Sequence, residues 1–421
     1  MISQIGWIDF SPEHRDKVTR VIGLLSSPGT VDELGIGVIR NAFSNRFFPG
    51  LSTIQTRAKY FIIVPRILRE YDAMADRDKK KFPSLVRYLQ QAEDHCNRLL
   101  VTKHAGENQY GIFGAENVAQ NRLLQRMPSS VYWNGLRTYG LISAPLSLAE
   151  FLADYQRRSR TDSHRHGSTD QTRGDDVDAG HHADQPVRIP DDNRDWKEEL
   201  SIHLSSNEAE YLQEAMTQHA PGSLLAYLLN EDDGMKQIQS LNGNDFDSLL
   251  SLDCIQRLEG RDADLYRTVQ AASDFWRVMF GAHIRYNQLL QKQNSDSPGA
   301  FDENWSEWYE QIRGDQELWS RWDTAWLWRL VGTQGSGLRA PTRIFVESWS
   351  KSIQVGDTRQ LDGIVANQER LNKGTRARLR TGGERVAEGQ WIGISSLSYR
   401  LPTARRIVQD IAAGLDSGAT S

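Results

Sequence analysis

The hydrophobic pattern of the chain is that of a helical protein. Apolar residues recur at three- and four-residue steps from Leu265 to Leu290, a stripe of about seven helical turns. The same spacing runs through 305–330, where six of the twelve tryptophans lie. Ser205 and Glu208 form a capping-box pattern ahead of a further apolar run. We therefore expect a mainly α fold.

The N-terminal part shows the same periodicity, with one ambiguity. Helices are expected over 11–25, 31–44 and 83–100, each close to a capping residue or a proline. Residues 60–64 are apolar on all sides and precede Pro65. This run is either a buried helix kinked at the proline or a short buried strand, because periodicity does not distinguish the two.

A polar stretch divides the chain. Residues 157–195 contain no Leu, Met, Phe, Tyr or Trp, so they cannot bury enough apolar surface to offset the entropy of ordering. We expect a disordered linker there, between a helical domain at 1–156 and a second one at 196–421. Four of the ten histidines lie in this stretch without the carboxylate or thiol spacing of a metal site, so no metal is predicted.

A helix-turn-helix pattern covers residues 116–142. The first helix would end at a turn over Met127-Pro128-Ser129, and the second, capped by Ser130, would leave through a Tyr-Gly-Leu-Ile exit as in winged-helix proteins. Asn134 and Arg137 would lie on the outward face, where amide and guanidinium groups can bind base edges. The alternative is a helical hairpin packed inside a domain.

Two further sets of cations could contact phosphate. Arg57 and Lys59 fall in the polar first turns of the segment 52–69, where a recognition helix would touch DNA. The alternative is a solvated first turn that leads into a buried element. The region 370–406 holds nine Arg and Lys against two Glu, whereas the whole chain carries −5. Charge segregated in this way suits a phosphate backbone, or it forms a basic surface strip without a ligand. The candidate contacts in this region are Arg376, Arg378, Arg380, Arg405 and Arg406.

One polar group interrupts the long apolar stripe: His283, Arg285, Tyr286 and Asn287. Buried polar side chains need partners, so a network is expected, either structural or lining a catalytic or small-molecule site. The sequence has no Walker A loop, complete dinucleotide fingerprint, nucleophile elbow or zinc motif. We predict no cofactor, and the pattern leaves open whether the protein is an enzyme.

Composition bears on the location of the protein. No run of 18 apolar residues and no secretory signal pattern is present. Cys96 and Cys254 form no disulfide framework. We expect a cytoplasmic protein without a membrane partner.

Several segments resemble a family of bacterial proteins, a domain of unknown function of similar length. The resemblance covers most of the chain outside 157–195 and implies no known activity and no catalytic residue. The occurrence of such proteins among mobile-element and antiphage-defence genes implies work near DNA. The segments are GWIDFS (6–11), DELGIGVIRNAF (32–43), FFPGLSTIQTRAKYFIIVP (47–65), MPSSVYWNGLRTYGL (127–141) and GAHIRYN (281–287).

The leading hypothesis is a non-catalytic DNA-binding or accessory component of a bacterial defence or mobile-element system, with DNA and other defence proteins as partners. One alternative is an enzyme with a site around His283. Another is a protein–protein scaffold that uses Trp328 or the helical faces of the C-terminal part.

Overall fold

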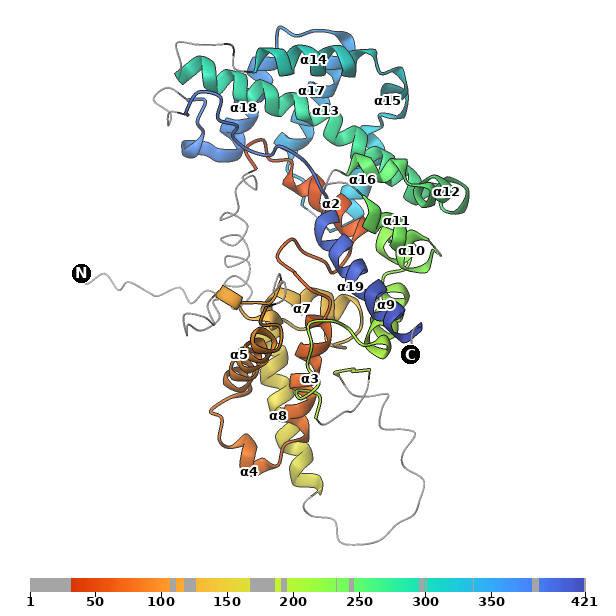
Figure 1. Cartoon of the computed structure of the whole chain (residues 1–421). Helices are drawn as coiled ribbons and strands as arrows, with labels where there is room; N and C mark the ends of the chain where they lie inside the picture. Colours follow the sequence, from red (N-terminus) through yellow and green to blue (C-terminus); the bar gives the residue numbers. More distant parts are fainter. Residues whose placement is uncertain are drawn as a thin grey trace, which may run out of the picture. The chain divides into compact units, whose positions relative to one another are not determined.

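The computed structural model shows a mainly helical chain, as the periodicity predicts (Figure 1). Among the described residues the only β pairing is a single antiparallel bridge between Ile142 and Val187. None of the described helices is both long and apolar enough to cross a membrane. The structure describes residues 32–106, 111–116, 126–166, 186–190, 195–231, 233–241, 246–294, 299, 301–335, 337–380 and 386–419.

The chain divides into two compact units, each assembled from two separate stretches of sequence. Unit 1 comprises Met1–Phe47 and Asn242–Tyr399, and unit 2 comprises Phe48–Leu241 and Arg400–Ser421. The predicted domain at 196–421 contributes to both units, so the limits predicted from the polar stretch do not follow this division.

Unit 1 is built around α13, which packs against α12, α14, α17 and α18. The predicted stripe on α13 is buried, with Leu265, Val269 and Leu290 at 1%, 0% and 0% exposure. The described elements of this unit are α2 (Gly37–Phe47), η1 (Asp247–Ser251), α12 (Asp253–Arg261), α13 (Ala263–Asn294), α14 (Asp302–Gly314), α15 (Gln316–Arg321), α16 (Thr324–Thr333), α17 (Ala340–Val355), α18 (Leu361–Lys373) and η2 (Gly374–Arg376).

The tryptophan-rich segment 305–330 forms three helices rather than the continuous one that its spacing suggests. Two aspartates explain the breaks. The Asp315 carboxylate accepts the backbone N–H of Leu318 and begins α15, and the Asp323 carboxylate accepts that of Trp326 and begins α16. Both are side-chain caps that favour a new helix start over continuation.

Unit 2 joins residues from both sides of the polar stretch. Its α19 packs against α9 and α11, while α3 packs against α5 and α7. The described helices are α3 (Tyr60–Ala73), α4 (Asp76–Lys79), α5 (Leu85–Lys103), α7 (Pro128–Thr138), α8 (Leu148–His166), α9 (Ser206–His219), α10 (Leu224–Asn230), α11 (Gly234–Ser240) and α19 (Leu401–Ala419).

The ambiguous apolar run after Lys59 is helical. Residues 60–68 of α3 are all buried, and Pro65 lies inside the helix. The capping box predicted at Ser205 and Glu208 is also confirmed at the start of α9.

The expected disordered linker is wrong at both of its ends. Helix α8 continues through residues 157–166, and Val187 is 2% exposed and pairs with Ile142. Helix α8 begins with the apolar residues that follow Ser147 and continues into the first part of the polar stretch. The bridge to Ile142 orders the polar stretch around Val187. Residues 167–185 and 191–194, like the predicted helix at 11–25, lie outside the described residues.

We predict that Gly281→Ala destabilises unit 1 by about 1–3 kcal/mol, because overpacking a tight core strains its neighbours. A Cβ at Gly281 would lie 2.2 Å from the Trp308 ring. That ring is held by its own hydrogen bond, from Nε1 to the Arg277 carbonyl at 2.7 Å. Urea unfolding measures the change.

The matched control is Gly363→Ala on α18, where a Cβ meets no atom within 4 Å. This variant should gain about 0.5–1 kcal/mol because alanine is the better helix former. Equal effects of the two substitutions would contradict the packing argument.

Candidate functional site

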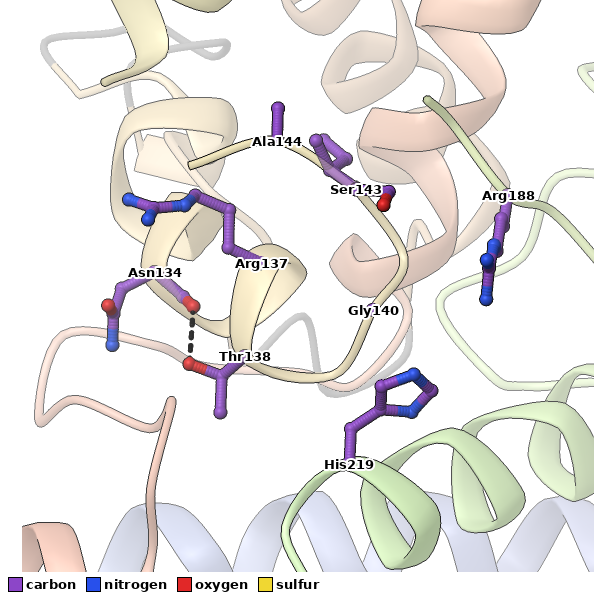
Figure 2. A pocket seen from close by; sticks show the side chains of 9 residues that line it. Asn134, Arg137, Thr138, Gly140, Ser143, Ala144, Arg188 and His219 are labelled. Carbon is purple, nitrogen blue, oxygen red and sulfur yellow. Dashed lines mark hydrogen bonds between the residues drawn. The ribbon is translucent and has the colours of Figure 1, made fainter. Parts of the chain in front are cut away.

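A polar hollow of about 400 Å³ opens in unit 2 beside the end of α7 (Figure 2). None of the described residues that line it is an aspartate or a glutamate. Two of those residues, Asn134 and Arg137, are the outward pair that the sequence predicts on this helix. The lining consists of Asn134, Arg137, Thr138, Gly140, Ile142, Ser143, Ala144, Arg188 and His219.

Helix α7 presents Asn134 and Arg137 because its opposite face is pressed into the unit. A Cβ at Gly135 would lie 2.6 Å from the Phe61 ring and 2.8 Å from the Gly50 carbonyl oxygen. Glycine at this position is therefore a packing requirement of α7 against α3. Val131 and Leu136 of α7 are buried, while Asn134 and Arg137 are exposed.

The start of α7 differs from the prediction. The helix begins at Pro128, in the first helical position, and Met127 is its N-cap. Ser130 is already helical, and its hydroxyl donates to the Met127 carbonyl at 2.8 Å. The first helix of the proposed helix-turn-helix falls largely on residues 117–125, which lie outside the described residues.

A buried carboxyl group anchors this start to α5. Glu93 is 1% exposed, and it accepts the Ser129 backbone N–H at 2.5 Å and the Ser129 hydroxyl at 3.2 Å. Burial raises the pKa of Glu93 to about 8, although the bonds from Ser129 oppose this shift. Near neutral pH the carboxyl group is therefore largely protonated.

The exit from α7 brings Arg188 to the hollow. The Ser143 N–H donates to the Pro186 carbonyl at 2.8 Å, and the Arg188 N–H donates to the Leu141 carbonyl at 2.9 Å. This short pairing occupies the place of the predicted winged-helix exit, but it is one bridge and not a described wing. Figure 2 shows Arg137 and Arg188 on opposite sides of the segment that carries Gly140 and Ala144.

His219, the last residue of α9, closes another side of the hollow. A Cβ at Gly140 would lie 2.3 Å from His219 Nε2, and the φ of Gly140 is +68°. Only glycine allows both that backbone conformation and the close approach of the imidazole. The other ring nitrogen, Nδ1, lies 3.0 Å from the Ala215 carbonyl oxygen.

The hollow carries uncompensated positive charge. Within the described part of the chain, no carboxylate pairs with the guanidinium of Arg137 or Arg188, and both side chains are exposed. The effect of Arg188 extends to Tyr211: burial raises the pKa of this phenol, and the arginine charge opposes that rise.

The structure places Arg57 and Lys59 elsewhere than predicted. They lie in the loop before α3 rather than in helical turns. Arg57 binds the Asp410 carboxylate at 2.9–3.0 Å. Lys59 Nζ lies 2.6 Å from Glu208, with 5% of its side chain exposed. Both cations are neutralised within the unit, so neither is positioned to face a phosphate.

The basic region 370–406 falls on both units, with Arg376, Arg378 and Arg380 in unit 1 and Arg405 and Arg406 in unit 2. Several of its cations have internal partners. Lys373 pairs with Glu33 at 3.0 Å, and Arg405 donates to the Gln239 carbonyl at 2.6 Å. Arg376 and Arg380 are exposed, and residues 381–385 lie outside the described ranges.

Three of the four polar residues on α13 are engaged in structure. The Tyr286 hydroxyl donates to Glu369 at 2.8 Å, and Arg285 pairs with Asp362. Asn287 exchanges two hydrogen bonds with the backbone of Ile392, at 2.8 and 3.0 Å.

His283 is the exception in this group, since it is fully buried and neither ring nitrogen has a hydrogen-bond partner among the residues that the structure describes. Burial lowers its pKa to about 3, which keeps the imidazole neutral and makes it a poor acid or base near neutral pH. None of the four residues lines the hollow around Arg137.

The profile of the family of unknown function DUF6361 matches residues 2–362. The chain belongs to DUF6361. No curated protein and no solved structure matches it. Membership in DUF6361 agrees with the resemblance seen in the sequence and supplies no residue roles.

Two residues of the hollow, Arg188 and His219, were not found from the sequence. Arg188 lies in the stretch expected to be a disordered linker, and His219 ends a helix without a motif around it. Their positions follow from the bridge at Val187 and from the contact with Gly140. No local pattern could have indicated either of them.

We predict that Glu93→Gln flattens the pH dependence of stability between pH 5 and 8. The pKa of Glu93 lies near 8 in the folded chain, above its ordinary value of 4.5. The folded state therefore holds the extra proton in this window, and stability falls as the pH rises, by up to about 1.4 kcal/mol per pH unit. Urea unfolding at several pH values measures the slope.

Glu150→Gln is the control. Its hydrogen bonds with Ser147 lower the pKa of Glu150, so its contribution changes only below the ordinary carboxyl range. The slope between pH 5 and 8 should stay that of the wild type in this variant. An unchanged slope in Glu93→Gln would contradict the assignment.

Proposed function

We propose that this protein binds DNA through its phosphate backbone, with the hollow around Arg137 and Arg188 as a principal contact. The observation that carries the proposal is the pair of exposed guanidinium groups that border one hollow without a carboxylate partner among the described residues. Arginine is well suited to phosphate because its planar fork donates two parallel hydrogen bonds.

The placement of the two arginines favours a polymer over a single small anion. Their side chains lie on opposite sides of the 140–144 segment and do not close on one point (Figure 2). Such separated cations can contact successive phosphates of one strand. The hydroxyl-bearing residues Thr138 and Ser143 also line the hollow, and hydroxyls are common phosphate ligands.

Asn134 gives the surface a means of reading bases. It is exposed on the outward face predicted for α7. The Thr138 hydroxyl donates to its backbone carbonyl at 2.8 Å, so this bond does not involve the side-chain amide. A side-chain amide can bind adenine through two hydrogen bonds in a major groove. The winged-helix interpretation of this segment belongs to the same proposal.

The biological setting is also part of the proposal. The resemblance to proteins found among defence and mobile-element genes favours a non-catalytic DNA-binding or accessory component that works with other proteins of such a system. The enclosed His283 and its engaged neighbours give no support to the enzyme alternative. Trp328, the anchor of the scaffold alternative, donates its indole N–H to Glu347 at 2.7 Å.

We predict that Arg137→Ala and Arg188→Ala each weaken binding to a short mixed-sequence DNA duplex and each reduce its salt dependence. Each lost phosphate contact should lower the slope of log K against log salt by about one. Fluorescence anisotropy between about 50 and 200 mM salt measures both quantities.

Arg87→Ala is the charge-matched control. Arg87 is an exposed arginine on α5 that hydrogen-bonds only weakly, to Gln90 at 3.4 Å, and lies outside the hollow. Its slope should equal that of the wild type. The proposal is rejected if the wild type does not bind at low salt, or if the hollow variants and this control behave alike.

A further inference from the structure

A second hollow, of about 300 Å³, lies in unit 1 between α13 and the connection from α15 to α16. Its apolar walls come from Phe275, Trp322, Trp326 and Leu327. Binding sites for small molecules are concave, mainly apolar and furnished with a few polar groups, and this volume is at the lower end of their range.

Two ion pairs border these aromatic walls. Arg321 binds Asp274 through two hydrogen bonds of 3.0 and 3.1 Å. Arg267 binds Asp323 at 3.0 Å. The lining therefore carries two positive and two negative charges, which cancel. It offers both hydrogen-bond donors and acceptors, and it has no excess charge with which to select an ion.

The wall of this hollow also contains an unsatisfied donor. Trp322 Nε1 is buried and has no hydrogen-bond partner within the described ranges. A buried N–H without an acceptor is unusual and calls for a ligand or a water nearby. Burial also raises the pKa of Asp274, against the opposing effect of Arg321, and perturbed carboxyl groups in hollows are more frequent at functional sites.

We propose that this hollow binds a neutral, flat heteroaromatic ring of the nucleobase class. Such a ring can stack on the half-buried Trp326 indole, since every base has a π face. The Arg267 guanidinium lies 5.0 Å from the centroid of this indole, at the border of the same hollow. The edge of such a ring carries acceptors and donors that can bind the polar atoms of the two ion pairs. The site shares no residue with the hollow around Arg137 and does not rest on the function proposed above.

The alternatives fit the lining less well. A cationic ligand would meet the guanidinium groups of Arg267 and Arg321, and an anionic one would meet the carboxylates of Asp274 and Asp323. A purely aliphatic group would not compensate for the loss of water around the two ion pairs.

The test is calorimetric titration of the full chain with adenosine, guanosine, cytidine and thymidine. We expect at least one nucleoside to bind the wild type. Ala271→Phe should weaken that binding ten-fold or more, because Ala271 lines the hollow and a phenyl group would fill it. Ala263→Phe is the matched control, on the exposed part of the same helix and outside the lining, and should bind like the wild type.

Trp326→Leu is a second variant that removes a stacking surface without blocking the hollow. Loss of base–aromatic stacking should weaken binding about ten-fold. Thermal unfolding of each variant shows whether it is folded. The nucleoside affinity of either variant that is folded tests the proposal.

The source of the base is distinguished by a second titration, with single-stranded DNA and with the same strand made abasic. If Ala271→Phe weakens binding of the intact strand, the hollow takes bases presented by a strand; if it weakens nucleoside binding only, the ligand is a free nucleoside. The proposal is overturned if no nucleoside or strand base binds the wild type, or if Ala271→Phe binds like Ala263→Phe. Arg137→Ala should leave nucleoside affinity unchanged, so this failure is separate from that of the proposed function.

Discussion

Unit 2 depends on one buried carboxylate, that of Glu208, which two cations neutralise. Lys59 Nζ lies 2.6 Å and Arg66 lies 2.8 Å from its oxygens, and the carboxylate also accepts the Ser205 N–H that completes the capping box of α9. A charge buried without partners would be strongly destabilising, so this arrangement fixes the start of α9 against α3. Helix α9 ends at His219, and α3 supplies Phe61, on which α7 packs. The positions of α7 and His219 around the hollow therefore depend on the contact between α9 and α3 at Glu208.

In unit 1, buried side-chain amides stabilise non-helical backbone by hydrogen bonding to it. Asn287 bonds both backbone groups of Ile392, and Gln291 Nε2 donates to the Ala387 carbonyl at 3.0 Å. Buried backbone groups outside helices need such partners. Polar residues on an apolar stripe thus have a structural explanation, and their residue types alone could not separate it from a catalytic one.

Local signals in the sequence were sufficient for some of the helices. The stripe on α13 and the capping box at Ser205 depend on residues three or four positions apart, so they can be found without tertiary structure. The roles of Arg57 and Lys59 could not be found in this way, because their partners, Asp410 and Glu208, are distant in sequence. For the hollow in unit 2, the sequence indicated Asn134 and Arg137, while the residues opposite them depend on tertiary contacts.

A local excess of positive charge in the sequence is a poor guide to a phosphate-binding surface, because the fold can pair such cations with internal partners. The region 370–406 is the most basic part of the chain, yet Lys373 there is bound by the buried Glu33. A cation already paired in this way has little remaining attraction for an external anion, since its field is largely cancelled at short range. Arg137 stands in a less basic segment and has no such partner in the part of the chain that the structure describes. The pairing of each cation, which only the fold determines, decides which of them can reach a phosphate.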